Sequence, residues 1–265
     1  MNRRTFTQGA AATLAAALTG RASASESADP FASLRAKNID IGILIFPRMD
    51  QIDFTGPFSV LSRVPASSVH VIARNAGPIK DHKGLILTPD KTLAEAPPLD
   101  VLLIPGGPGQ EALMEDEPVL SLIRKQASEG KIVFSVCTGA LICGAAGILR
   151  GRRATTHWAA FDLLRYFGAV PVESRVVVDG NLVSAAGVTA GIDGALMLAS
   201  LLRNDEVAQG IQLDIQYAPK PPFNSGEPGS APREVLAAVT ERYRPIKAAR
   251  ELTARKAAKR LAVTL

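Results

Sequence analysis

The chain has 265 residues, of which 47% are hydrophobic and 21% charged, with a formal net charge of +5. About 240 residues follow an N-terminal leader, enough for one sizeable core, and no stretch among them resembles an interdomain linker. Three arginines fall in the leader, so the remaining charge is 5 − 3 = +2, which leaves a nucleic-acid partner little electrostatic support.

The first 24 residues have the features of a bacterial export signal. Paired arginines at positions 3 and 4 precede Phe6, and the Ala- and Leu-rich stretch 9–20 is too short to span a bilayer. Ala22-Ser-Ala24 is a candidate cleavage site. The paired arginines favour the twin-arginine route, although an ordinary export signal can contain such a pair by accident. We therefore expect a periplasmic protein that begins near Ser25.

From residue 39 onward, strand and helix signals alternate, after a stretch 25–37 that we expect to be a mobile tether. The predicted strands are 40–46, 69–73, 101–104, 132–136 and 182–185. The predicted helices are 57–64, 118–129, 138–146, 158–167 and 191–203.

In two of these strands the runs 41–46 and 101–104 have no polar face, as expected for a parallel sheet covered on both sides. Asp179-Gly180 predicts a tight hairpin within this pattern. The fold class is therefore α/β: a doubly wound, mostly parallel sheet between helices, of the flavodoxin-like type, with function at the carboxyl ends of the strands. We assign 38–224 to this domain and 225–265 to a C-terminal helical extension.

Cys137 stands where the β-branched run 132–136 changes abruptly to small residues. This pattern predicts a sharp strand-to-helix turn, similar to a nucleophile elbow, although Ser135 replaces the first glycine of the usual motif. A helix N-terminus behind the sulfur would lower the thiol pKa. The alternative is an inert cysteine packed as a small hydrophobic residue.

Cys143 is the other cysteine of the chain. Six residues after Cys137 on one helix, it would lie on a different face, so a disulfide is not expected. We interpret Cys143 as a core residue. Two unpaired thiols in an oxidising compartment favour a reactive role for Cys137.

The loops after three predicted strands carry polar or glycine residues that should meet at one edge of the sheet. They contain Asp50 and Asp53, then Gly106 and Gly107, then Cys137-Thr138. No dinucleotide or Walker motif is present, so nucleotide binding has no support. The N–H groups of Gly107 and Thr138 are candidate donors to a negatively charged intermediate, whereas each glycine alone is as consistent with a tight turn.

Four motifs together resemble the class I glutamine-amidotransferase-like superfamily, in its PfpI-type branch. They are Pro105-Gly-Gly107, Ser135-Val-Cys-Thr-Gly139, Ala154-Thr-Thr-His-Trp158 and Thr189-Ala-Gly-Ile-Asp193. Further stretches, Asp53-Phe-Thr-Gly-Pro57 and Gln216-Tyr-Ala-Pro-Lys-Pro-Pro-Phe-Asn224, are similar to the isonitrile hydratase-like members. The resemblance covers about residues 39–224.

The resemblance implies an enzyme that adds water to an isonitrile and releases an N-substituted formamide, without a metal or another cofactor. The catalytic residues of such enzymes fall on Asp53, Cys137 and Thr138. The resemblance also implies a homodimer, with Phe223 in an apolar Pro-rich stretch. Members of this kind are usually cytoplasmic, which an export signal would not fit. PfpI-type peptidases have histidine after the cysteine, so Thr138 argues against peptidase chemistry.

Several polar residues have weaker functional signals. His157 is expected to line the pocket together with Gly106, while His70 and His82 lack the matched ligands of a metal site. The alternative for Asp53 is a residue that only precedes a helix opening at Pro57. Asp50 is a second choice as the acid, and Asp193 is expected to support a helix N-terminus.

The C-terminal stretch is strongly basic. From Arg244 onward seven Lys or Arg face a single acid, Glu251, which favours a solvated helical face over a membrane-surface contact.

Other functions remain open at this point. The protein could be a periplasmic sensor, binding or thiol-stress protein without turnover, or another small-molecule hydrolase or lyase that uses the same cysteine. Release of a formamide from an alkyl isonitrile would distinguish the hydratase. Related domains also occur in transcription regulators, but this chain leaves no room for a helix-turn-helix domain and export would remove it from DNA.

Overall fold

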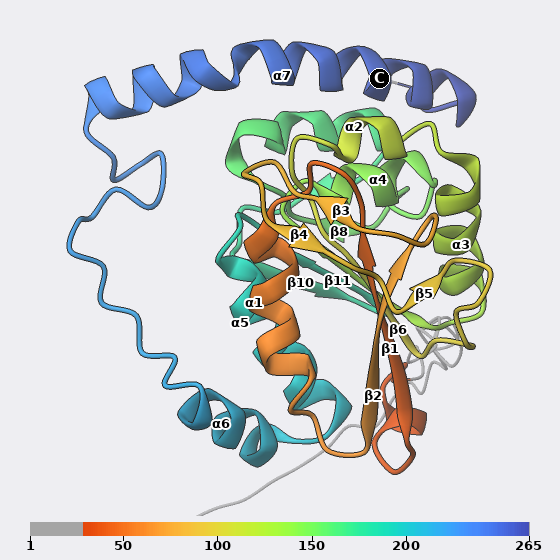
Figure 1. Cartoon of the computed structure of the whole chain (residues 1–265). Helices are drawn as coiled ribbons and strands as arrows, with labels where there is room; N and C mark the ends of the chain where they lie inside the picture. Colours follow the sequence, from red (N-terminus) through yellow and green to blue (C-terminus); the bar gives the residue numbers. More distant parts are fainter. Residues whose placement is uncertain (1–28, 265) are drawn as a thin grey trace, which may run out of the picture.

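The computed structural model describes residues 29–264, and its centre is a seven-stranded sheet (Figure 1). The predicted leader, residues 1–24, lies outside the described residues. The strand order is β10-β11-β7-β6-β1-β2-β5, and β10 alone runs antiparallel to its neighbour. These strands are β1 (Ile39–Ile45), β2 (Ser67–Ala73), β5 (Lys91–Thr92), β6 (Val101–Ile104), β7 (Ile132–Val136), β10 (Val176–Asp179) and β11 (Leu182–Ala185).

Helices cover both faces of this sheet, which confirms the predicted fold class. Helices α1 (Gln51–Leu61), α5 (Ala190–Leu202) and α6 (Asp205–Asp214) pack on one another along one face. The other face carries α2 (Gln110–Leu113), α3 (Glu117–Ser128), α4 (Gly139–Ala145) and the 3₁₀ helix η2 (Trp158–Phe167). Two small strand pairs, β3 (Ile79–Lys80) with β4 (Ile86–Leu87) and β8 (Arg153–Ala154) with β9 (Val170–Pro171), lie outside the main sheet.

The central strands are apolar because both of their faces are buried. Every residue of β6 and β7 is buried, as are all residues of β1 except Asp40. The hairpin at Asp179-Gly180 is confirmed, since β10 and β11 pair antiparallel around it. Hydrophobic side chains of the strands therefore form the core that holds the loop ends in place.

Helix α1 begins six residues earlier than the sequence predicts. Asp50 caps it, since the Asp50 side chain accepts a hydrogen bond of 3.0 Å from the N–H of Ile52. Pro57 lies inside the helix rather than at its first position. The consequence is that Asp53 belongs to the first turn of α1 and does not simply precede a helix.

The segment 29–37 is not the expected mobile tether. Phe31 and Leu34 are buried in the core; Phe31 directly precedes a short 3₁₀ helix, η1 (Ala32–Leu34), and Leu34 is its last residue. Arg203 donates a hydrogen bond of 2.7 Å to the carbonyl of Leu34. Helix α6 was not predicted; Asn204 caps it by accepting from the N–H of Val207 at 2.9 Å.

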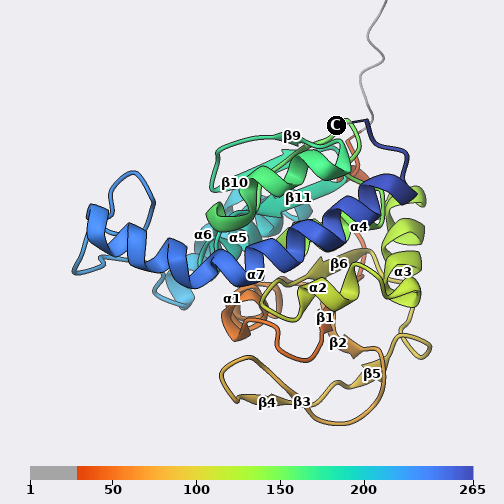
Figure 2. The ribbon, with the colours of Figure 1, turned by 90° about the horizontal axis from the view of Figure 1, so that it is seen from above.

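Helix α7 (Arg233–Arg260) runs across the top of the domain in Figure 1. It contacts η2, α4 and α2, and the view from above shows it lying across the body (Figure 2). Its basic side chains were expected on a solvated face, but one side is buried through Arg250, Thr253, Ala254, Ala257 and Ala258. No helix within residues 29–264 is long and apolar enough to cross a membrane.

Candidate active site

The site lies where β7, β6 and β1 end, three strands that are neighbours in the sheet. The loop after β1 leads into α1 with Asp53, the loop after β6 holds Gly106 and Gly107, and Cys137 follows β7. The carboxyl ends of adjacent parallel strands meet at one edge of the sheet, so the three loops lie together as predicted. The structure brings Asp53, Cys137 and Thr138 together there.

Cys137 adopts the sharp turn that the sequence predicts. Its φ is +55°, a left-handed conformation that is unfavourable for a residue with a side chain. The N–H of Cys137 donates a hydrogen bond of 3.0 Å to the carbonyl of Ala185 on β11, which holds the strained residue. At Gly139 a Cβ would lie 2.1 Å from the carbonyl oxygen of Ile104, so only glycine lets α4 start this close to β6.

Asp53 is fully buried at the bottom of the site. Its Oδ2 accepts a hydrogen bond of 2.9 Å from the N–H of Gly106, while Oδ1 has no hydrogen-bond partner among residues 29–264. Burial raises the pKa of Asp53 well above its usual range, and the negative charge of Asp50 adds to this effect; the Gly106 N–H, the Cys137 thiol and Arg250 oppose it. Asp53 can therefore keep a proton at a pH where a surface carboxyl has lost it.

The pKa of Cys137 differs from the expectation. Burial raises it well above the ordinary thiol value, and the nearby Asp53 carboxylate raises it further. The N–H of Thr138 and the guanidinium of Arg250 favour the thiolate but do not compensate. The expected lowering of the pKa is thus wrong, because the cysteine is only 5% exposed and the helix behind it has only seven residues.

Thr138 lies at the N-terminus of α4, and its hydroxyl is hydrogen-bonded to the glycine loop. The N–H of Gly107 donates to Thr138 Oγ1 at 3.0 Å, so it faces this oxygen and not the open pocket. A donor role of Gly107 toward an intermediate stays a prediction, and it requires that bond to break. Gly106 approaches Thr138 closely; a Cβ on it would lie 2.4 Å from the Thr138 nitrogen.

A cavity of about 70 Å³ opens above Cys137 and Thr138. The rest of its wall comes from six other parts of the chain that are distant in sequence: Asp50, His82, Gly107, Pro108, His157, Val188, Tyr243, Ile246 and Arg250. Its volume is close to that of a few water molecules. The cavity is therefore suited to the reacting end of a small molecule.

His157 lines the cavity, as predicted, and is held by the backbone. Its Nδ1 accepts a hydrogen bond of 3.2 Å from the N–H of Ala159, so the proton of the neutral ring is on Nε2. Burial, together with the positive charge of Arg250, lowers the pKa of His157 to about 4. The ring is neutral at physiological pH, which favours a structural role over general acid catalysis.

Helix α7 contributes three cavity residues that the sequence analysis missed: Tyr243, Ile246 and Arg250. The Tyr243 ring packs against His157, with centroids 5.4 Å apart. The spacing of Tyr243, Ile246, Arg250, Ala254 and Ala257 follows one face of a helix, a signal that the abundance of charge in this stretch obscured.

Other candidate residues have structural positions. Asp193 lies in the first turn of α5 and pairs with Arg175, as expected for support of a helix N-terminus. Cys143 is completely buried, and burial raises its pKa to about 12, consistent with a core residue. His70 pairs with Asp40 at 2.7 Å on the sheet, outside the cavity.

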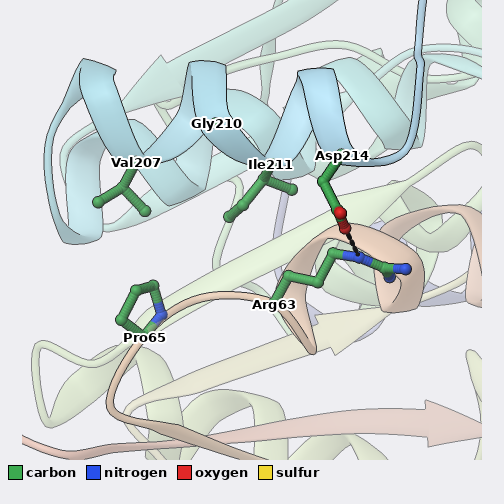
Figure 3. A pocket seen from close by; sticks show the side chains of 6 residues that line it. All are labelled: Arg63, Pro65, Val207, Gly210, Ile211 and Asp214. Atoms are coloured by element: carbon green, nitrogen blue, oxygen red, sulfur yellow. Dashed lines mark hydrogen bonds and ion pairs between the residues drawn. The ribbon is translucent and has the colours of Figure 1, made fainter.

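A second, larger cleft of about 390 Å³ lies between the end of α1 and α6 (Figure 3). Arg63 and Asp214 form an ion pair of 2.6 Å across it, and Pro65, Val207, Gly210 and Ile211 line the rest. It contains neither a nucleophile nor a buried acid. In the described part of the chain, no group of three or more His, Cys, Asp or Glu could hold a metal ion.

Comparisons with known proteins show which family and fold this chain is similar to. The model of the DJ-1/PfpI family matches residues 40–201. The isonitrile hydratase of Pseudomonas putida is 49% identical over 222 residues, which cover 83% of this chain and 97% of that protein. A ThiJ/PfpI family protein from Pseudomonas syringae has a similar crystal structure, with a TM-score of 0.80, 34% identity and coverage of 89% and 97%. Drosophila melanogaster DJ-1beta is similar at a TM-score of 0.64 and 25% identity, with coverage of 69% and 100%.

Proposed function

The chain belongs to the DJ-1/PfpI family, and we propose that within this family it is a lyase that adds water to an isonitrile and releases an N-substituted formamide. The observation that carries the proposal is the burial of the Asp53 carboxyl group beside the Cys137 thiol. Similarity to the Pseudomonas putida isonitrile hydratase extends over nearly the whole of that protein and supports the same chemistry here.

The isonitrile carbon must acquire both a nucleophile and a proton. In the first step Sγ of Cys137 bonds to this carbon, the carbon takes a proton from Asp53, and the thiol proton passes to Asp53. The product is a thioimidate, R–N=CH–S–Cys137. Because burial and the Asp53 carboxylate raise the pKa of Cys137, the sulfur loses its proton during the attack and not before it.

The second step returns the enzyme to its starting form. Water adds to the thioimidate carbon, and the nitrogen gains a proton through Asp53. The C–S bond then breaks, the sulfur is reprotonated, and R–NH–CHO leaves. The oxygen and one proton of the water enter the formamide, and the other proton restores the thiol proton that the first step delivered to the carbon through Asp53. The proposed reaction needs only the side chains of the site and no metal or other cofactor.

The test is formamide production from a small alkyl isonitrile, followed by mass spectrometry. We expect the wild-type protein to form the formamide and Cys137→Ala to form none, with an unchanged circular dichroism spectrum. Cys143→Ala is the matched control and should keep wild-type activity, because that thiol is buried away from the cavity. Hydration by Cys137→Ala at the wild-type rate would exclude the thioimidate mechanism.

A sensor or binding protein of the same family is the second candidate, since the cavity is small and buried. Such a protein would bind an isonitrile or be oxidised at Cys137 without releasing formamide. The same assay therefore separates the two functions: multiple turnovers per Cys137 support the lyase, and a single stoichiometric modification supports the sensor.

We further propose that the protein works in the periplasm after export by the twin-arginine route. The support is the paired arginines and the Ala22-Ser-Ala24 site of the sequence. Cleavage near Ser25 should appear when the mature N-terminus is sequenced. Replacement of both Arg3 and Arg4 by lysine should leave the precursor in the cytoplasm, and normal export of that variant would contradict the route.

A further inference from the structure

Arg250 is a buried cation in the cavity for which the proposed chemistry has no use yet. Its side chain comes from α7, is 3% exposed, and forms no ion pair among residues 29–264. Its Nε has no hydrogen-bond partner in that part of the chain either. Burial of a charged group without a counter-ion is costly, so its place beside Cys137 and Asp53 calls for an explanation.

The contacts of Arg250 converge on the loop that frames the cysteine. Its Nη2 donates to the carbonyl of Gly107 at 3.0 Å and to Oγ1 of Thr138 at 3.4 Å. Thr138 Oγ1 also accepts from the N–H of Gly107. A hydroxyl group has two acceptor lone pairs and one proton. Gly107 and Arg250 therefore occupy both lone pairs of this oxygen.

The hydroxyl proton of Thr138 has only one acceptor of suitable geometry within the described residues. That acceptor is the carbonyl of Gly107, at 3.5 Å, which already accepts from Arg250 at the shorter distance of 3.0 Å. The proton is thus held weakly. It can turn toward the cavity, where Thr138 contributes to the wall together with Cys137.

We propose that Arg250 is a positioning residue that keeps the Thr138 hydroxyl as a donor to the reacting nitrogen and balances the negative charge formed on the sulfur. The charges that face it come from Cys137, Asp53, Glu111 and Tyr243, and the first two belong to the site itself. The role of Arg250 in positioning the Thr138 hydroxyl, the kinetic half of this inference, rests on the proposed isonitrile hydration. The effect of its charge on the Cys137 sulfur, the electrostatic half, does not depend on that reaction.

The experiment compares Arg250→Met and Arg250→Lys in the full chain. We expect Arg250→Met to lower kcat by about 10- to 100-fold with little change in KM, as for the loss of a charge-assisted hydrogen bond. Its Cys137 should react with iodoacetamide more slowly than in wild type at a fixed pH near 8, with a titration shifted to higher pH. Arg250→Lys should restore the alkylation profile but not kcat, because lysine keeps the positive charge but lacks the planar guanidinium group with its several N–H donors.

A double-mutant cycle tests the link to Thr138. Thr138→Val combined with Arg250→Met should lower kcat by less than the product of the two single effects, since the part of the Arg250 effect that acts through the hydroxyl is already lost in Thr138→Val. Arg255→Met is the matched control: it removes an exposed arginine from the same helix and should change neither readout.

Three results would overturn the proposal. They are fully additive effects of the two changes, a loss of activity confined to substrates that carry a carboxylate, or an unchanged alkylation profile in Arg250→Met. If Arg250→Met does not fold, Arg250→Lys decides alone through its kcat and its alkylation profile. If the wild-type protein hydrates no isonitrile, the proposed function fails, yet the alkylation profiles still decide the electrostatic half.

Discussion

At the scale of single residues, the buried pair of Asp53 and Cys137 sets the chemistry of the site. The Asp53 carboxylate raises the pKa of the Cys137 thiol, because a second negative charge in a dry pocket is costly, whereas the neutral thiol lowers the pKa of Asp53 by donating a hydrogen bond to its carboxylate. The two protons are therefore titrated as a pair. This arrangement suits a reaction in which carbon receives a sulfur and a proton in the same step.

The pair of Asp53 and Cys137 predicts that one substitution changes thiol reactivity and turnover in opposite directions. Asp53→Asn removes the charge that disfavours the thiolate, so the pKa of Cys137 should fall, and alkylation at fixed pH should accelerate by about tenfold per pKa unit removed. Turnover should nevertheless slow by about 10²–10⁴-fold, because no proton donor remains. Alkylation rates between pH 6 and 10 and formamide release measure the two effects. Parallel changes in both would contradict the pairing.

His157 gives a second prediction at this scale. A pKa of about 4 leaves its ring neutral over the working range, so the histidine can contribute no titration between pH 6 and 9. His157→Gln should therefore leave the shape of the pH profile unchanged, with at most a modest loss of kcat from poorer packing against Tyr243. Disappearance of one limb of the profile in this variant would show that the histidine is an acid or base.

The positions of the main site residues could be predicted from the sequence. The abrupt change at Ser135-Val-Cys-Thr indicates the turn at Cys137, and the positions of strand ends indicate that Asp53 lies nearby. The direction of the Cys137 pKa could not be predicted, because it depends on how deeply the sulfur is buried and on which carboxylate touches it. Local sequence gives neither quantity.

At the scale of elements, the five predicted strands lie within two residues of β1, β2, β6, β7 and β11, because strands in the middle of the sheet are largely apolar. The two-residue strand β5 at the edge of the sheet was not predicted. The start of α1 and the buried side of α7 were not predicted. A proline usually opens a helix, whereas Pro57 lies inside one. In α7 the inward face combines Tyr243 and Ile246 with an arginine, a threonine and alanines, a weak hydrophobic stripe among many charges, and its burial depends on packing against η2, α4 and α2.

Helix α7 should be essential for activity but not for the fold of the sheet. Truncation after Ser230 removes Tyr243, Ile246 and Arg250 from the cavity and exposes Cys137. We expect loss of turnover and faster alkylation, while far-ultraviolet circular dichroism loses only the contribution of the helix. A truncated protein with wild-type turnover would show that α7 is dispensable.

At the scale of the whole molecule, we propose a homodimer. Several large apolar side chains are exposed on α6, the segment after it and α7: Leu213 at 81%, Phe223 at 77% and Val235 at 48%. Contact with a second copy would cover them. Small-angle scattering at micromolar concentration should give twice the monomer mass, and Phe223→Ser should shift the protein toward the monomer. A monomeric wild type would contradict the proposal.

The length of the segment between α6 and α7 affects how firmly α7 closes the cavity. This segment runs from Ile215 to Pro232 along the side of the domain without a helix or strand, and it ends at the helix that closes the cavity (Figure 1). Closure of the site is therefore an intramolecular association, and its strength depends on the effective concentration of α7, which the length and stiffness of this connection set. A longer or looser connection would dilute the helix without changing any residue that touches the substrate. Turnover can thus vary with a part of the chain that lies outside the catalytic contacts.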